Sequence, residues 1–259
     1  MIDYSSREWS YMLGVIHGDG HVAKRSVEIA VSYKEAAYAD TLVAMWKGLG
    51  FQPKVYRPRS ALRINVHSAA LADDLRETKL RGLWTIPQDV RVGDYFAGII
   101  DTDGHATKPP QRQVVVTLKR SGNLHRLCDK LVGAGLRCNP VKERTSSYLG
   151  RPYEIEELRW SGGDQIKWIA TNCPLRHPRK ADRLLSMQEE VLAIKADVPL
   201  WRRVAEWIAG EARDYDEIRA RFSLTKRQAD SVMDNIKANC RVEIIPPPRV
   251  LTKYRVMHG

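Results

Sequence analysis

Residues 12–20 read MLGVIHGDG and residues 96–104 read FAGIIDTDG, and the two stretches align without a gap at an offset of 84 residues (96 minus 12). In both, small and apolar residues at helical spacing lead into an Asp-Gly pair, so we expect a helix over each stretch. Ser5 and Glu8 have the spacing of a capping box before the first helix, and Asp94 has the equivalent place before the second. The glycine after each Asp is expected to end its helix in the left-handed conformation.

Each predicted helix has a narrow face of small side chains. Gly14 and Gly18 lie four residues apart in the first helix, as do Gly98 and Thr102 in the second. Two such faces allow helix backbones to approach closely. We therefore expect the two helices to pack side by side and to end at the same place.

The carboxylates at those ends, Asp19 and Asp103, occupy an unfavourable position. A helix C-terminus carries partial negative charge, which disfavours an acidic residue there by about 0.3–1 kcal/mol. Two carboxylates at close range also repel each other. A hard divalent cation with oxygen ligands would remove both conflicts, so we interpret the pair as a metal site. The simpler alternative is that each Asp-Gly is a surface turn with its carboxylate in water.

The residues around the motifs repeat one order of elements. Residues 1–90 and 91–197 each read as helix, two strands, helix, two strands and helix, because apolar and polar residues alternate in the strands and form stripes in the helices. In the second half we expect strands at 139–144 and 153–160, joined by a loop over 146–152. The predicted class is α+β, a duplicated αββαββα arrangement with two antiparallel sheets.

The second motif resembles the LAGLIDADG motif of homing endonucleases almost letter for letter, and the first is similar except for His17 in place of the motif's first Asp. The resemblance covers about the first 195 residues. It implies a monomer of the two-motif type, whose two sheets form a DNA-binding saddle. It also implies that Asp19 and Asp103, at the eighth motif position, carry the catalytic, metal-binding carboxylates, whereas the sixth position is not an essential ligand.

The same resemblance implies the chemistry. The expected activity is that of a site-specific homing endonuclease, which cuts both strands of a long asymmetric DNA target by metal-dependent phosphodiester hydrolysis. Mg²⁺ is the expected cofactor, replaceable in crystals by Mn²⁺ or Ca²⁺, and is bound by the two aspartates and by carbonyl oxygens near them, at Gly18 and Thr102. The family usually adds a basic or amide side chain near each scissile phosphate, and Lys34 and Lys119 are the candidates.

Composition and charge suit a polyanionic partner. The chain of 259 residues has 42 Lys and Arg against 31 Asp and Glu, a formal net charge of +11 and a pI near 9.6. Such side chains displace phosphate counterions and supply most non-specific affinity for nucleic acid, although a generic basic protein has the same balance. The four cysteines show neither metal-ligand nor disulfide spacing. No signal peptide or membrane-spanning run is recognisable, so we expect a soluble intracellular protein of a microbial cytoplasm or nucleoid, or of an organelle.

Strands and ribbons of β-structure fit the DNA major groove, where each base pair shows a distinct pattern of donors and acceptors. Basic and amide side chains at strand positions are therefore candidates for contact with double-stranded DNA, each with the alternative of being a solvated surface charge. In the first half these residues are Lys24, Arg25, Arg57, Arg59, Arg63 and Asn65. In the second half they are Lys108, Arg112, Gln113, Lys119, Lys142, Arg144, Arg151 and Arg159.

Residues 198–259 form the third predicted domain. Two short helical segments, a tight turn and a helix opened by a Thr-x-x-Gln capping box suggest a helix-turn-helix. The DNA-facing start of its last helix contains Lys226, Arg227 and Gln228. Weak alternation around the prolines at 246–248 suggests the hairpin of a winged variant. The alternative is an ordinary helical extension that packs on the nuclease body.

Two other classes of protein remain open. A non-cleaving transcription regulator of the WhiA type joins a degenerate LAGLIDADG body to a C-terminal helix-turn-helix; the C-terminal segment favours this class, and the intact pair of aspartates favours the nuclease. An intron maturase is the other, because the sequence does not separate folded RNA from duplex DNA. Two unlike halves in one chain favour an asymmetric site over the palindrome that suits a symmetric dimer, so we expect a monomer.

Overall fold

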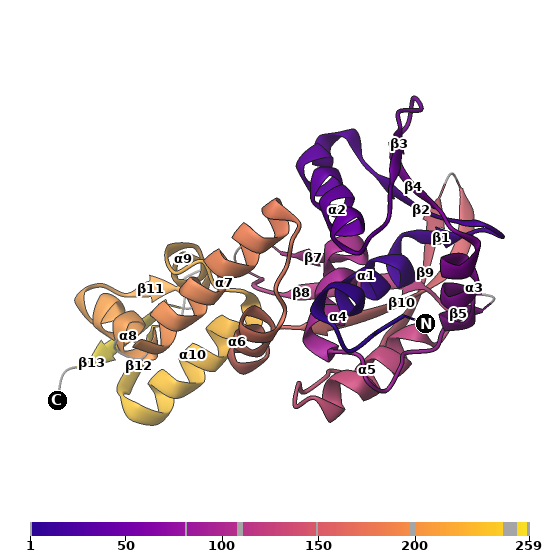
Figure 1. Cartoon of the computed structure of the whole chain (residues 1–259). Coiled ribbons are helices and arrows are strands. Elements are labelled where there is room, and N and C mark those ends of the chain that lie inside the picture. Colours follow the sequence, from indigo (N-terminus) through magenta and orange to yellow (C-terminus); the bar gives the residue numbers. More distant parts are fainter. Residues whose placement is uncertain are drawn as a thin grey trace. The chain divides into compact units, whose positions relative to one another are not determined.

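A computed structural model describes residues 2–80, 82–107, 111–148, 150–196, 200–245 and 253–257 (Figure 1). The chain divides into two compact units, Met1–Thr107 with Gln113–Gln188, and Lys108–Arg112 with Glu189–Gly259. The first unit contains most of both predicted halves, and the second begins inside the last helix of the second half. Within the described ranges, no helix is long and apolar enough to cross a bilayer.

A four-stranded antiparallel sheet in the order β1-β2-β4-β3 forms the first half. Val27 and Ile29 of β2 are buried and pair with Val66 and Ile64 of β4, so these alternate positions form the inner face of the sheet. The elements in chain order are α1 (Arg7–Gly18), β1 (Gly20–Val22), β2 (Ser26–Val31), η1 (Tyr33–Glu35), α2 (Ala36–Gly48), β3 (Lys54–Tyr56), β4 (Leu62–His67) and α3 (Ala69–Thr78).

The second half repeats this arrangement, with a sheet in the order β7-β8-β10-β9. The shared strand order confirms the predicted duplication. A two-stranded hairpin, β5 (Lys79–Leu80) and β6 (Leu83–Trp84), precedes it. The elements are α4 (Val92–Asp103), β7 (Gly104–Ala106), β8 (Val114–Lys119), α5 (Asn123–Gly133), β9 (Lys142–Tyr148), β10 (Arg151–Trp160), α6 (Gly163–Asn172) and α7 (Pro178–Ala196).

Both motif helices begin elsewhere than predicted. The N-cap of α1 is Ser6 rather than Ser5. The N-cap of α4 is Arg91, and Asp94 lies in the first turn, where its carboxylate pairs with Arg91 at 3.1 Å. The Arg91 N–H donates to Ser10 Oγ of α1 at 2.8 Å. A side chain of the neighbouring helix thus accepts the N–H of the N-cap residue, and α4 has no side-chain cap of its own.

The prediction that Gly20 and Gly104 end their helices in the left-handed conformation is wrong. Both residues open strands, and Gly104 has φ −93° and ψ 161°. A Cβ on Gly20 would lie 2.5 Å from Ile16 Cα, and a Cβ on Gly104 would lie 2.7 Å from Ile100 Cα. Glycine is required at each site because the strand begins close against the last turn of the preceding helix, where a Cβ would clash. A positive φ is not the reason.

Strand β9 starts and ends later than the predicted strand over 139–144. It pairs with β10 as far as Tyr148 and Arg151, so most of the predicted loop over 146–152 belongs to the sheet. Gly150, at the turn, has φ +76°, a conformation that glycine adopts without steric cost.

Over the described residues 200–245 and 253–257, the second unit contains three helices and a three-stranded sheet in the order β11-β13-β12. The predicted capping box at Thr225 and Gln228 and the predicted C-terminal hairpin are both confirmed, and residues 246–248 lie outside the described ranges. The unit has its own apolar core, which includes Val204, Ile208, Ile218, Met233 and Ile236. Its elements are α8 (Leu200–Gly210), β11 (Arg213–Asp214), α9 (Tyr215–Arg221), α10 (Lys226–Asn239), β12 (Arg241–Ile245) and β13 (Lys253–Met257).

Candidate metal centre

Helices α1 and α4 lie side by side and touch backbone to backbone (Figure 1). A Cβ on Gly14 would lie 2.1 Å from the carbonyl oxygen of Tyr95, and a Cβ on Gly98 would lie 2.2 Å from that of Tyr11. No side chain fits at such distances. The predicted close approach of the two small faces is therefore confirmed.

The C-terminal ends of these helices bring the two motif carboxylates together. Asp19 is the C-cap of α1, and its N–H donates to Val15 O at 3.0 Å. Asp103 is the last residue of α4, and its Oδ2 lies 2.5 Å from where a Cβ of Gly18 would stand. The carboxylate of the second half thus rests on the end of the first half's helix, beside the residue that precedes Asp19.

The protein does not relieve the conflict between these acids. Desolvation and the charge of Asp19 raise the pKa of Asp103 from 3.8 to about 7, against the opposing effect of nearby lysines. Desolvation also raises the pKa of Asp19, although one side of this residue stays open to solvent. The pair therefore favours a proton or another cation between the two carboxylates.

Lys79, the first residue after α3, places its ammonium at the end of α1. Its Nζ donates to the carbonyl oxygens of Ile16, Gly18 and Gly20 at 2.8, 3.3 and 2.7 Å. The partial negative charge of a helix C-terminus favours a cation at this place. Desolvation nonetheless lowers the pKa of Lys79 to about 8, with the two motif aspartates acting in the opposite direction.

Lys180, in the first turn of α7, does the same at the end of α4. Its Nζ donates to the carbonyl oxygens of Ile100, Asp101 and Thr102 at 2.9, 2.8 and 3.1 Å. Desolvation lowers its pKa as well. Each helix end thus has a carboxylate and a lysine that comes from a distant part of the chain.

The two lysines predicted from the sequence lie on the surface, and two other lysines lie at the helix ends. Lys34 lies in η1 and Lys119 ends β8, and both are exposed. The cations that lower the pKa values of the two motif carboxylates are Lys79 and Lys180. They stand 60 residues (79 minus 19) and 77 residues (180 minus 103) from the aspartates. The one signal available in the sequence is that each follows the helix that closes the second strand pair of its half.

The donors at this centre suit a hard divalent cation. They are oxygens, namely the two carboxylates and the main-chain carbonyls of Gly18 and Thr102, which are the type of ligand that Mg²⁺, Mn²⁺ and Ca²⁺ prefer. Within the described part of the chain, no group of three or more His, Cys, Asp or Glu side chains could hold a metal. An ion here would complete its shell with water or with a substrate phosphate, as Mg²⁺ commonly does.

The sixth motif position is used inside the protein in both halves. His17 Nδ1 lies 2.8 Å from Tyr95 OH and its ring stacks on Trp84; burial lowers the pKa of His17 to about 3, so the ring is neutral. Asp101 Oδ2 accepts from Tyr11 OH at 2.6 Å and from two main-chain N–H groups that precede α7. Both side chains are thus engaged in contacts inside the protein.

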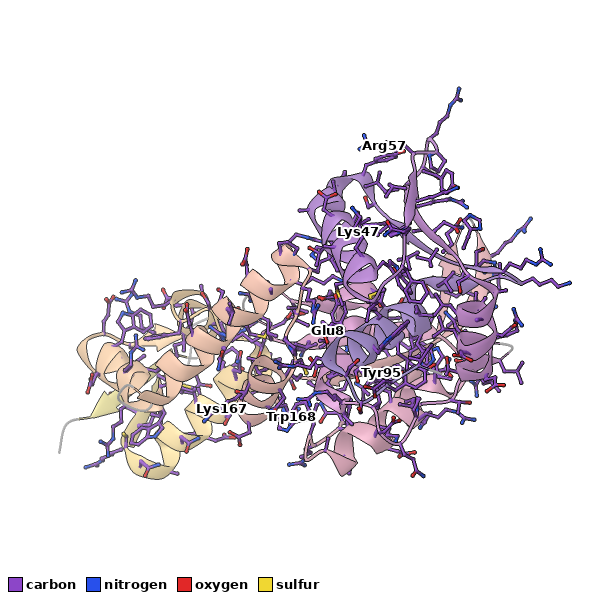
Figure 2. The ribbon with its side chains drawn as sticks, in the orientation of Figure 1. Glu8, Lys47, Arg57, Tyr95, Lys167 and Trp168 are labelled. Carbon is purple, nitrogen blue, oxygen red and sulfur yellow. The ribbon has the colours of Figure 1, made fainter. Side chains whose placement is uncertain are left out.

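The outer face of the first sheet is polar. Lys54, Asn65 and Glu28 stand opposite one another across the strands, and Arg63 Nη1 pairs with Glu28 Oε1 at 2.9 Å. Figure 2 marks Arg57 beside the connection that follows β3. The other exposed residues predicted to contact DNA in this half are Lys24 and Arg25, between β1 and β2, and Arg59, between β3 and β4.

The outer face of the second sheet carries an ion-paired cluster. Glu157 pairs with Arg144 at 3.0 Å and with Arg159 at 2.5 Å, and Arg159 Nη1 donates to Gln113 Oε1 at 3.4 Å. Lys119 shares this face, opposite Ile155 and beyond it Arg144. The remaining predicted residues of this half are Lys142 and Arg151, which are exposed, Arg112, which has φ +37°, and Lys108, which lies outside the described residues.

In the second unit, Lys226 and Arg227 are exposed at the start of α10. Gln228 is half-buried, and its Oε1 accepts from the Thr225 N–H at 2.9 Å. The amide oxygen of Gln228 is therefore engaged in capping its own helix.

Several solved structures are similar to this chain. The homing endonuclease I-WcaI bound to its DNA recognition sequence has a TM-score of 0.50 and 14% identity, over 71% of this chain and 88% of that one. Mesophilic variants of the homing endonuclease I-DmoI have a TM-score of 0.49 and 18% identity, over 71% and 100%. Full-length DUF199/WhiA from Thermatoga maritima has a TM-score of 0.45 and 15% identity, over 91% and 92%. No protein-family model and no curated protein matches the sequence.

Proposed function

Because this chain has the LAGLIDADG homing endonuclease fold, we propose that it is a site-specific, metal-dependent endonuclease that cuts both strands of duplex DNA. The observation that carries the proposal is the pairing of Asp19 with Asp103. The pairing contributes to raising the pKa of Asp103 to about 7, so the free protein loses stability by holding both acids together at neutral pH. A scaffold that only binds DNA has no use for such a pair.

In this mechanism the two carboxylates, with the carbonyl oxygens of Gly18 and Thr102, would hold Mg²⁺, for which Mn²⁺ or Ca²⁺ could substitute. A bound divalent ion polarises a phosphate and makes water a better nucleophile at neutral pH. Lys79 and Lys180 keep positive charge beside the site where negative charge grows during phosphodiester hydrolysis. We assign to them the role that the sequence suggested for Lys34 and Lys119.

The outer faces of the two sheets form the proposed DNA-binding surface. Ion pairs such as Arg63–Glu28 and Arg144–Glu157 hold guanidinium groups in fixed positions, which suits the bidentate reading of bases in the major groove. The proposed contacts are Lys24, Arg25, Arg57, Arg59, Arg63 and Asn65 in the first half, and Lys108, Arg112, Gln113, Lys119, Lys142, Arg144, Arg151 and Arg159 in the second.

The two halves would read different sequences. His21 and His105, at the same place after the two motifs, pair with Glu28 and Val115, so Glu28 and Asn65 of the first sheet correspond to Val115 and Arg159 of the second. A chain that carries both halves needs no second copy to complete the metal centre. We therefore propose a monomer with a long, asymmetric target.

The test is cleavage of a randomised duplex library by the purified chain in Mg²⁺ and in EDTA. We expect discrete double-strand cuts that require the metal and disappear in Asp19→Asn and in Asp103→Asn. Asp40→Asn is the matched control, since Asp40 is an exposed acid on α2 and its loss leaves the centre intact. Salt-sensitive binding without metal-dependent cuts would contradict the nuclease, and preferential binding of a folded intron RNA would favour a maturase.

The second unit supports DNA binding as a second candidate function, that of a sequence-specific binding module or regulator. Helix α9, the turn over 222–225 and helix α10 have the order of a helix-turn-helix, in which the start of the second helix approaches the bases. The β12–β13 hairpin follows directly. We propose that Lys226 and Arg227 contact DNA, with Gln228 fixing the helix start that presents them.

The acids around this surface are engaged within the unit. Asp230 accepts from Tyr215 OH at 2.5 Å, and Asp216 pairs with Arg219 at 3.3 Å. Asp214 and Glu217 form the capping box of α9. The negative charges near the start of α10 are thus partly neutralised by contacts within the unit. The exposed basic side chains there face solvent, an arrangement that suits the binding of a polyanion.

The salt dependence of DNA binding tests this second contact in EDTA, where no cut can occur. Replacing both Lys226 and Arg227 with Gln in the full chain should make the negative slope of log K against log salt shallower by about 2. Each phosphate contact contributes about 0.9 to the magnitude of this slope. The control with the same loss of charge is Lys47→Gln with Lys167→Gln, two exposed lysines on α2 and α6 (Figure 2). Equal slopes for the two double variants would exclude the contact.

A further inference from the structure

The two lysines at the candidate metal centre donate all of their ammonium N–H groups to main-chain carbonyl oxygens. A lysine ammonium has three N–H donors. Lys79 Nζ donates to three carbonyl oxygens at the end of α1, and Lys180 Nζ donates to three at the end of α4. Neither ammonium therefore has a proton left for a carboxylate or a phosphate in this arrangement.

Two of the six carbonyls are those that a metal ion would use. Gly18 O accepts from Lys79 and Thr102 O accepts from Lys180, and each of these residues directly precedes a motif aspartate. A carbonyl oxygen has two lone pairs, but an ammonium and a divalent cation on the same oxygen stand a few ångströms apart and repel strongly in protein surroundings. The ammonium and the divalent cation therefore cannot both bind one of these oxygens without weakening each other's contact.

We propose that Lys79 and Lys180 are the internal counter-cations of the metal-free centre and compete with the metal for Gly18 O and Thr102 O. Binding of an ion turns each ammonium away from that carbonyl and frees an N–H for a phosphate oxygen of bound DNA. The lysines thereby weaken metal binding by the free protein. This inference rests on the proposed metal site at Asp19 and Asp103.

The two contact patterns support exchange rather than fixed capping. In each, the contact with the metal-side carbonyl is the longest of the three, 3.3 Å for Lys79 and 3.1 Å for Lys180, while the other carbonyls lie at 2.7–2.9 Å. Each lysine can therefore release that oxygen and keep its two shorter bonds. The retained bonds hold the amine beside the site after the exchange.

The experiment measures Mn²⁺ binding by calorimetry and by the spin resonance of free Mn²⁺, on the full chain without DNA. We compare wild type with Lys79→Gln and Lys180→Gln, in which an amide keeps two N–H donors but the charge is lost. We expect each variant to bind Mn²⁺ about tenfold more tightly. The thermal midpoint of each variant should fall in EDTA and recover in saturating Mn²⁺, because the ion then supplies the missing charge.

Lys130→Gln is the matched control, since Lys130 Nζ also donates to a carbonyl, Pro87 O at 3.1 Å, away from the two helix ends. Its midpoint should fall equally with and without Mn²⁺, and its Mn²⁺ affinity should not change. Wild-type binding with equal or weaker binding in the Lys79 and Lys180 variants would overturn this inference alone. Absence of Mn²⁺ binding in wild type and both variants would overturn the proposed metal centre together with it.

Discussion

Gly14 and Gly98 are the residues at which one methyl group would force α1 and α4 apart. In Gly14→Ala the new Cβ would lie 2.1 Å from Tyr95 O, a backbone atom that cannot rotate away. Overpacking of this kind costs about 1–3 kcal/mol and sometimes more. We expect Gly14→Ala to lower the free energy of unfolding by at least about 2 kcal/mol, measured by urea denaturation.

Gly48→Ala is the control for that experiment. Gly48 is the last residue of α2, and a Cβ there would meet no atom within 4 Å. Alanine should leave stability unchanged or raise it by up to about 1 kcal/mol, because it restricts the unfolded chain. A loss at Gly48 as large as that at Gly14 would mean that the close approach of the helices is not the cause.

The raised pKa of Asp103 predicts a stability that depends on pH. A carboxyl whose pKa is higher in the folded state gives stability that is present below its unfolded pKa and is lost as the pH rises through the folded value. For Asp103 this window runs from 3.8 to about 7. In EDTA at pH 8, Asp103→Asn should therefore be more stable than wild type, by at least about 1 kcal/mol, since one pKa unit corresponds to about 1.4 kcal/mol.

This advantage should shrink as the pH falls through about 7 and approach zero below 3.8, where Asp103 is protonated in both states. Thermal midpoints of both proteins across that range test the prediction, with the exposed Asp40→Asn as the control. An advantage of Asp103→Asn that is the same at pH 4 and pH 8 would show that charge is not its origin.

At the scale of elements, helix α5 depends on a strand residue for its start. Its N-cap, Gly122, has φ +80° and offers no side chain, and the buried Glu156 of β10 supplies the acceptor instead. Glu156 Oε1 accepts from the N–H groups of Ser121 and Gly122 at 2.5 and 2.6 Å, and Oε2 accepts from Leu124 N–H at 3.2 Å. One carboxylate thus joins the second sheet to the helix that covers it.

Glu156→Gln should therefore destabilise the protein by about 1–3 kcal/mol, because hydrogen bonds to a charged group are the stronger ones and one oxygen becomes a donor that faces N–H groups. Relative to wild type, this variant should show a larger increase in amide hydrogen exchange in the first turn of α5 than in α2. Glu154→Gln serves as the control: Glu154 is exposed and its carboxylate accepts from Thr145 Oγ1 at 2.8 Å, so its loss should stay within about 0.5 kcal/mol. Similar effects of both changes would refute the capping role.

Sequence patterns predicted elements well where one helix or strand decides its own structure. The order of helices and strands in each half and the capping box at Thr225 and Gln228 were expected as observed, since alternation, apolar stripes and cap residues are local features. Sequence patterns failed where the bounds of an element depend on its contacts with another segment of the chain. Arg91 rather than Asp94 is the N-cap of α4, and its N–H donates to Ser10 of α1. Strand β9 extends as far as its pairing with β10 does. Neither partner can be known before the fold is known.

At the scale of the whole molecule, the same distinction separates the two parts of the proposed metal centre. The aspartates were predictable because the duplicated motif marks both of them and its glycines require the two helices to touch. Lys79 and Lys180 were not, because they reach the helix ends only after each half has folded back on itself. The spacing of the sequence motifs identifies the two aspartates, whereas the two lysines can be identified only in the folded structure.

Because each half contributes one carboxylate to the single centre that we propose, we expect neither half to cut DNA alone. Asp103 Oδ2 lies against Gly18 of the other half rather than over a site of its own. If each half served one strand independently, Asp19→Asn and Asp103→Asn would each leave one strand cut and give a nicking enzyme. We expect either change to reduce cleavage of both strands together, by at least about 100-fold, because loss of groups around a metal commonly costs 10–100-fold even outside its direct ligands. A duplex labelled at a different end of each strand distinguishes the two outcomes, and a nick confined to one strand in either variant would contradict the shared centre.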